Sequence, residues 1–79
     1  GIYEHSTMTF FHIDPANHQN RFSPNENGHW TLTDVTGRTI AGESTKPGEI
    51  YTAKVATSGI YFFTFVNAVG VVEVRKLIL

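Results

Sequence analysis

The chain has 79 residues, a formal net charge of −1 and no cysteine, with 41% hydrophobic and 16% charged residues. This length fits one small domain, and the hydrophobic fraction favours a packed core over a disordered segment. The near-zero charge, without a cluster of Lys and Arg, argues against a nucleic-acid-binding surface. No apolar run of 18 residues occurs, so we expect no membrane-spanning helix.

The N-terminal part predicts a linker followed by two strands. Residues 1–7 have no clear hydrophobic period and are predicted to be a linker, and residues 8–79 are expected to form the domain. Alternating side chains at residues 8–13 predict a first strand. Asp, Pro and Asn at residues 14–17 end it, because proline cannot donate to a β-ladder and Asp and Asn favour turns. A short second strand is expected over residues 21–23.

The middle of the chain has the most regular alternation. In residues 29–35, Trp30 and Leu32 share one face of the predicted strand, and threonines occupy the other face. A turn at Gly37 leads into residues 38–41, which we expect to return as the hairpin partner.

The last third of the chain predicts one more strand and a terminal β-hairpin. Residues 49–56 alternate, with Tyr51, Ala53 and Val55 expected on one face. Residues 60–66 and 71–79 are rich in β-branched and aromatic residues and flank a turn that contains Gly70.

The phase of the last strand poses a question. Val72 and Val74 share one face, whereas Leu77 and Leu79 fall on the other. We therefore expect either burial of both faces or a β-bulge that resets the phase. The six to seven short strands, with no helical period, predict an all-β fold: a small immunoglobulin-like antiparallel β-sandwich.

Few residues indicate chemistry. Four histidines lack the close spacing of a zinc motif, so we expect structural or surface roles, with no metal site and no cofactor; they are His5, His12, His18 and His29. Asp14 and Asp34 both lie beside turns, where Asp bonds to the backbone. No nucleophile or phosphate-binding motif occurs, so we do not expect an enzyme.

Three aromatic residues leave an alternative open. Trp30, Tyr51 and Tyr61 would form a sugar-stacking platform if they were exposed together, although aromatic residues on alternating strands of a small domain more often form core. The alternative function is accordingly an immunoglobulin-like accessory or carbohydrate-binding module of an extracellular protein.

Several short motifs follow one another in a fixed order. They are a turn with Asp34, Gly37 and Arg38, a strand start with Gly59 and Tyr61, a turn with Gly70, and the terminal Lys76-Leu77-Ile78-Leu79. Together, over residues 30–79, they resemble the C-terminal sorting domain of the type IX secretion system, the Por secretion tail of type A. The sequence departs from that family at His12-Ile13-Asp14-Pro15, where a Tyr-Pro-Asn-Pro segment is usual, and keeps only the second proline.

The resemblance implies a sorting function. Such a domain directs its cargo through the periplasm to the cell surface or the extracellular space. Its partners would be the outer-membrane translocon, a β-barrel shuttle protein and a cell-surface sortase that generally removes the domain.

An apolar C-terminal strand suits such a partner. It can bind by strand addition, in which main-chain hydrogen bonds give affinity and side chains give specificity. We expect Lys76, Leu77, Ile78 and Leu79 to enter the partner. The competing interpretation is that these residues only complete the sandwich. Because an apolar edge strand also pairs with its own kind, we further expect a homodimer formed by pairing or exchanging strands.

Overall fold

The computed structural model describes residues 7–70 and 72–79. Within these residues the chain forms seven β-strands and one short 3₁₀ turn. The elements are β1 (Met8–Asp14), η1 (Pro15–Asn17), β2 (Gln19–Pro24), β3 (Gly28–Asp34), β4 (Thr39–Thr45), β5 (Tyr51–Lys54), β6 (Ile60–Asn67) and β7 (Val72–Ile78). The second and fourth strands are longer than the sequence predicted.

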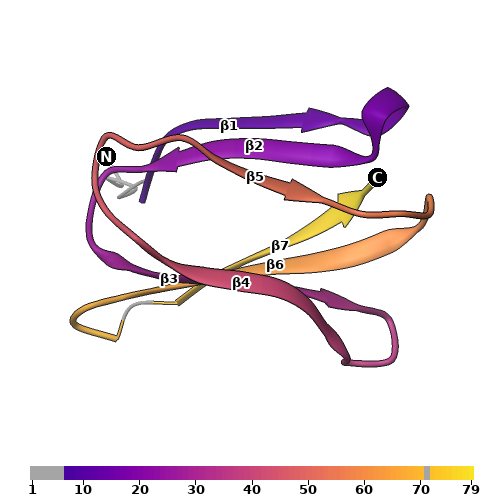
Figure 1. The fold of residues 1–79 in the computed structure, drawn as a ribbon. Coiled ribbons are helices and arrows are strands. Elements are labelled where there is room, and N and C mark those ends of the chain that lie inside the picture. Colours follow the sequence, from indigo (N-terminus) through magenta and orange to yellow (C-terminus); the bar gives the residue numbers. More distant parts are fainter. Residues whose placement is uncertain (1–6, 71) are drawn as a thin grey trace, which may run out of the picture.

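The strands form two antiparallel sheets that lie one above the other (Figure 1). One sheet has the order β1-β2-β5 and the other the order β4-β3-β6-β7. The chain passes between the sheets after β2, β4 and β5, which makes the fold a sandwich rather than one meander. The predicted all-β, immunoglobulin-like sandwich is confirmed, and the C-terminal strand β7 is an edge of the larger sheet.

The core lies between the two inner faces and is rich in aromatic rings. Phe22 from β2 meets Phe63 from β6 edge to face, with ring centroids 4.8 Å apart, and also packs edge to face on Trp30. Trp30 and Leu32 are both buried, as their shared face predicted, and so is the predicted set on β5. The alternation of side chains in these strands therefore identified their inner faces correctly.

The expectation for the phase of β7 was wrong. Pairing with β6 runs without a shift from Ile60 opposite Ile78 to Val66 opposite Val72, so there is no bulge. Burial of both faces does not occur either, because Val72 and Val74 are 55% and 61% exposed. The strand keeps one regular phase and leaves apolar side chains on its outer face.

The start of the folded domain lies one residue earlier than predicted. Thr7 is buried, and its carbonyl oxygen accepts a hydrogen bond from the Asn25 N–H at 2.9 Å. Its hydroxyl donates a short hydrogen bond to Glu73 on β7. Thr7 therefore belongs to the domain, and the remainder of the predicted linker, residues 1–6, lies outside the described residues.

Candidate functional site

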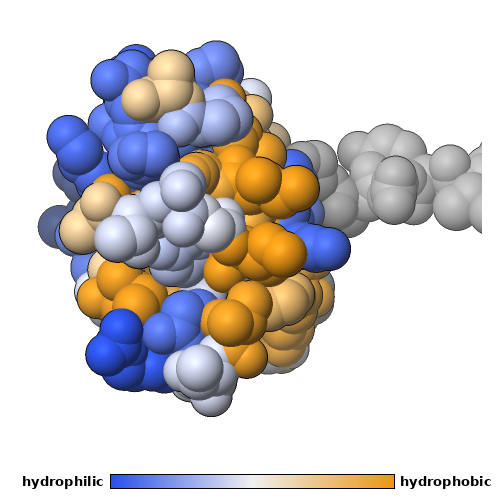
Figure 2. Space-filling view, turned by 90° about the vertical axis from the view of Figure 1, so that its right-hand side faces the viewer, coloured by the Kyte–Doolittle hydropathy of each residue, from blue (hydrophilic) through white to orange (hydrophobic). Residues whose placement is uncertain are grey.

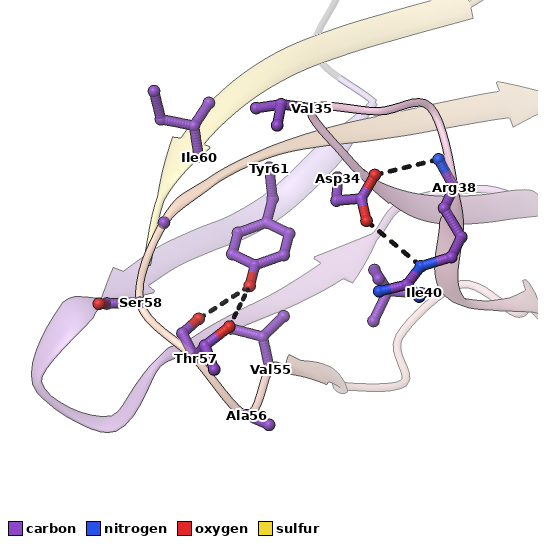
Figure 3. A pocket seen from close by; sticks show the side chains of 11 residues that line it. Asp34, Val35, Arg38, Ile40, Val55, Ala56, Thr57, Ser58, Ile60 and Tyr61 are labelled. Atoms are coloured by element: carbon purple, nitrogen blue, oxygen red, sulfur yellow. Dashed lines mark hydrogen bonds and ion pairs between the residues drawn. The ribbon is translucent and has the colours of Figure 1, made fainter.

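One end of the sandwich carries a pocket of about 410 Å³ between the β3–β4 turn and the β5–β6 turn (Figure 3). Its lining contains four of the six residues of the motifs that precede the terminal Lys76-Leu77-Ile78-Leu79, namely Asp34, Arg38, Gly59 and Tyr61. Gly37 lies in the same β3–β4 turn, whereas Gly70 follows β6, whose other end borders the pocket. Folding thus brings two motifs together that are separated in the sequence.

Asp34 organises the β3–β4 turn. Its Oδ1 accepts hydrogen bonds from the Thr36 hydroxyl at 2.6 Å, the Thr36 N–H at 2.9 Å and the Arg38 N–H at 3.1 Å. Its Oδ2 lies 3.3 Å from Nε of Arg38. The Thr36 hydroxyl, the two N–H groups and the Arg38 charge lower the pKa of Asp34, against a smaller opposing effect of burial. Asp34 therefore stays ionised and fixes the turn, as its position beside a turn predicted.

Gly37 occupies a position that few other residues tolerate. Its φ is +87°, in the left-handed region that a side chain disfavours. No atom lies within 4 Å of the place where a Cβ would be, so the requirement comes from the backbone alone. The glycine of the Asp34 turn is thus needed for the hairpin and not for space.

Tyr61 connects β6 to the turn before it. The ring is buried, and its hydroxyl donates to the Thr57 carbonyl oxygen at 2.8 Å and lies 3.3 Å from the Thr57 hydroxyl (Figure 3). Immunoglobulin-type domains use a tyrosine at the start of a strand in the same way, to fix the corner between two sheets. These contacts hold the start of β6 against the turn that precedes it.

The four predicted partner-binding residues at the end of the chain alternate between core and surface. Leu77 and Leu79 are 1% and 2% exposed and belong to the core, whereas Lys76 is exposed and Ile78 is 65% exposed. On the folded domain, only Lys76 and Ile78 can meet a partner. Leu77 and Leu79 pack in the core of the sandwich, as the competing interpretation proposed.

The end of β7 is attached to both sheets. The Leu79 N–H donates to the Gly59 carbonyl oxygen at 2.9 Å, beside the pocket. Nδ1 of His18, in the other sheet's β1–β2 connection, lies 3.1 Å from the Leu79 oxygen, and the His18 carbonyl accepts from the Val55 N–H at 2.9 Å. Sequence reasoning missed this role of His18, which depends on residues far away in the chain.

The inner face of β7 begins with two charged residues. Nη2 of Arg75 lies 2.7 Å from Oε1 of Glu73, and the Arg75 guanidinium lies 4.2 Å from the ring centre of Phe11 on β1. Burial raises the pKa of Glu73, but the hydrogen bonds from Thr7 and Arg75 and the Arg75 charge outweigh it, so the pKa is lowered. These contacts close the side of the sandwich between β7 and β1.

The outer face of β6 and β7 is more apolar than solvent-facing strands usually are. The exposed apolar residues there are Ile60, Val66, Val72, Val74 and Ile78. Figure 2, which faces the pocket end of the sandwich, shows hydrophobic residues gathered mainly over its right half, whereas hydrophilic residues dominate the upper left. On the outer face Ile60 lies opposite Ile78 and Val66 opposite Val72, and exposed apolar residues of this kind are typical of an interaction surface.

The structure gives no support to an aromatic platform or a histidine metal site. Trp30, Tyr51 and Tyr61 are all buried, so they do not present a surface on which a sugar could stack. In the described part of the chain, no three His, Asp or Glu side chains gather as metal ligands would. His5 lies outside that part.

Among residues 7–70 and 72–79, no helix has the length and hydrophobicity that crossing a membrane requires. No family model, curated protein or solved structure matches the chain. The residues and contacts described above therefore carry the functional proposal.

Proposed function

We propose that this domain is a C-terminal sorting signal that directs an attached cargo protein across the outer membrane through the type IX secretion system. In this proposal, the outer-membrane translocon and a β-barrel shuttle protein bind the domain after it reaches the periplasm. A surface sortase then removes the domain from cargo that has arrived at the cell surface or outside the cell.

The observation that carries the proposal is the free edge of β7. In an antiparallel strand, the backbone N–H and C=O groups of every second residue point toward the same neighbouring strand. The Leu79 N–H bonds to Gly59, so the backbone groups of the odd-numbered residues of β7 point toward β6. The N–H and C=O groups of its even-numbered residues point away from the sheet. A partner strand can add to these groups, with Lys76 and Ile78 beside it to supply specificity.

The position of the sequence motifs adds support. Gly59, whose carbonyl binds the end of β7, also lines the pocket that Asp34 and Arg38 border. Gly59 therefore fixes the end of the strand whose outer edge a partner would meet, whereas the Asp34 turn follows β3, on the other side of β6. The Gly59 motif thus contributes directly to the shape of the docking edge in this proposal.

A secretion assay with a reporter cargo tests the proposal in a bacterium that has this export system. Because deletion of the last four residues would remove two core leucines, the sharper variant is Lys76→Glu with Ile78→Asp, which changes only outward side chains. We expect most of this cargo to stay in the periplasm. Lys54→Glu, at an exposed position of the edge strand β5, is the matched control and should be secreted normally.

The folded state of each variant is checked by circular dichroism. Normal secretion of the folded Lys76→Glu/Ile78→Asp variant would contradict the docking edge. It would favour the alternative function, an immunoglobulin-like accessory module, because such a module needs no signal on β7.

A further inference from the structure

The charged residues of β7 are arranged so that the strand is complementary to a second copy of itself that runs in the opposite direction. Glu73 and Arg75 lie two residues apart on the same face, with side chains 25% and 36% exposed. When a second copy of the strand runs antiparallel beside the first, it presents the same two charges in the opposite order. Glu73 and Arg75 can thus each lie opposite a residue of opposite charge in a second copy of the same domain.

We propose that two copies of this domain pair through their β7 edges, antiparallel, about a two-fold axis at Val74. In this register Val74 lies opposite Val74 of the second copy, and Val72 lies opposite Lys76 of the second copy. Glu73 lies opposite Arg75 of the second copy, and the symmetry repeats that contact. The two larger sheets then continue into one another.

The main-chain hydrogen bonds allow this register. The even-numbered residues of β7 carry the outward N–H and C=O groups, so the pairs formed by Val74 with its copy and by Val72 with Lys76 are hydrogen-bonded pairs. Glu73 of one copy and Arg75 of the other then form a non-hydrogen-bonded pair of the ladder. In such a pair the Cα atoms are about 4.5 Å apart and the side chains are closest. The opposite charges therefore meet where their attraction is greatest.

The neighbouring registers are electrostatically worse. Moving the axis to Glu73 places the two Glu73 side chains opposite each other, and moving it to Arg75 does the same for the two arginines. Moving it to Lys76 brings two lysines together. Like charges directly opposite in a sheet are destabilising. Of these four registers, only the one with its axis at Val74 pairs opposite charges, so the charges favour it over the other three.

The partner is a second copy because the same short segment supplies both halves of the complementarity. Val72 and Val74, which are exposed on the single domain, become partly covered in the pair. The pairing would occupy the same edge that we propose for the export partner, but it does not depend on the export function. Normal secretion of the Lys76→Glu/Ile78→Asp variant would contradict the export proposal and not the pairing, and a monomeric domain would contradict the pairing and not the export proposal.

Charge reversal tests the register by sedimentation velocity over a range of protein concentrations at low salt. The wild-type domain should show a concentration-dependent monomer–dimer equilibrium. Glu73→Arg and Arg75→Glu each create like-charge contacts twice in the dimer, and each should weaken self-association about tenfold or more. Lys54→Glu should leave it unchanged.

Two rescue measurements separate the dimer contact from damage to the fold. Glu73→Arg loses the bond to Thr7, and Arg75→Glu loses its contact with Phe11, so circular dichroism must show that both variants are folded. An equimolar mixture of the two variants restores opposite charges and should form heterodimers. The double variant with the charges exchanged should form homodimers again.

Three outcomes would overturn the proposal. The first is a wild-type domain that remains monomeric at millimolar concentration. The second is wild-type self-association in both folded single variants, which would place the contact elsewhere or require exchange of whole strands. The third is a mixture of the two variants that stays monomeric.

Discussion

Replacing Leu77 by alanine should destabilise the domain strongly, whereas replacing its neighbour Ile78 should not. Leu77 is 1% exposed and Ile78 is 65% exposed, although both belong to the same apolar C-terminal strand. Leu77→Ala deletes about three buried methyl or methylene groups, which are worth about 0.8 kcal/mol each in transfer free energy. The cavity that remains adds to this, so the expected loss is about 3–5 kcal/mol.

That loss is large for a domain of this size. At about 0.05–0.15 kcal/mol per residue, 79 residues give a free energy of unfolding of about 4–12 kcal/mol. Leu77→Ala should therefore lower the melting temperature by about 10 °C or more, because each kcal/mol corresponds to about 4–8 °C in small domains. Ile78→Ala should change the stability by about 0.5 kcal/mol or less, as exposed substitutions do.

Urea unfolding measures both variants. Trp30 is the single tryptophan and is buried in the core, so its fluorescence reports the loss of tertiary packing. Equal unfolding midpoints for Leu77→Ala and the wild type would refute the packing of β7 described above. A large loss for Ile78→Ala would refute the assignment of its side chain to the outer face.

Two further variants test contacts at the pocket and at the side of the sandwich between β7 and β1. Tyr61→Phe removes the hydrogen bond to Thr57 and should cost about 1 kcal/mol by urea unfolding. The lowered pKa of Glu73 means that its contribution is complete above its ordinary pKa of 4.5 and is lost as the pH falls through the lower folded pKa. Glu73→Gln should therefore lose less stability than the wild type on acidification below about pH 4.5, measured by thermal unfolding; an identical acid dependence would contradict the Thr7 and Arg75 contacts.

The strands with strict alternation could be predicted from the sequence, and the last strand could be predicted only in part. In β3, Trp30 and Leu32 stand against threonines, so only one face is suited to the core. In β7, both faces carry apolar residues, and hydrophobicity alone does not choose between them. Its inner face accepts Glu73 and Arg75 because they lie at the edge beside β1, where they bond to one another and Glu73 also accepts a hydrogen bond from Thr7.

The contacts around the pocket show a second limit of prediction from the sequence, which is the distance along the chain. The Asp34 turn was predictable because its hydrogen bonds reach only two to four residues along the chain. The contact between His18 and Leu79 spans 61 residues and exists only after both sheets have packed. No local pattern indicates such a contact, so the sequence predicted for His18 only a structural or surface role without naming a partner.

The alternation of β7 separates folding from recognition within one strand. Odd-numbered residues supply the bonds to β6, the charged contacts near β1 and the two core leucines, while even-numbered residues supply the free backbone edge and the exposed side chains. A substitution at Leu77 should therefore mainly lower the stability of the domain, and one at Ile78 should mainly weaken the binding of a partner. A shortened tail alters both at once, and its effect on export cannot be assigned to docking. Single substitutions on the outer face leave the core intact and attribute a change in export or pairing to the edge itself.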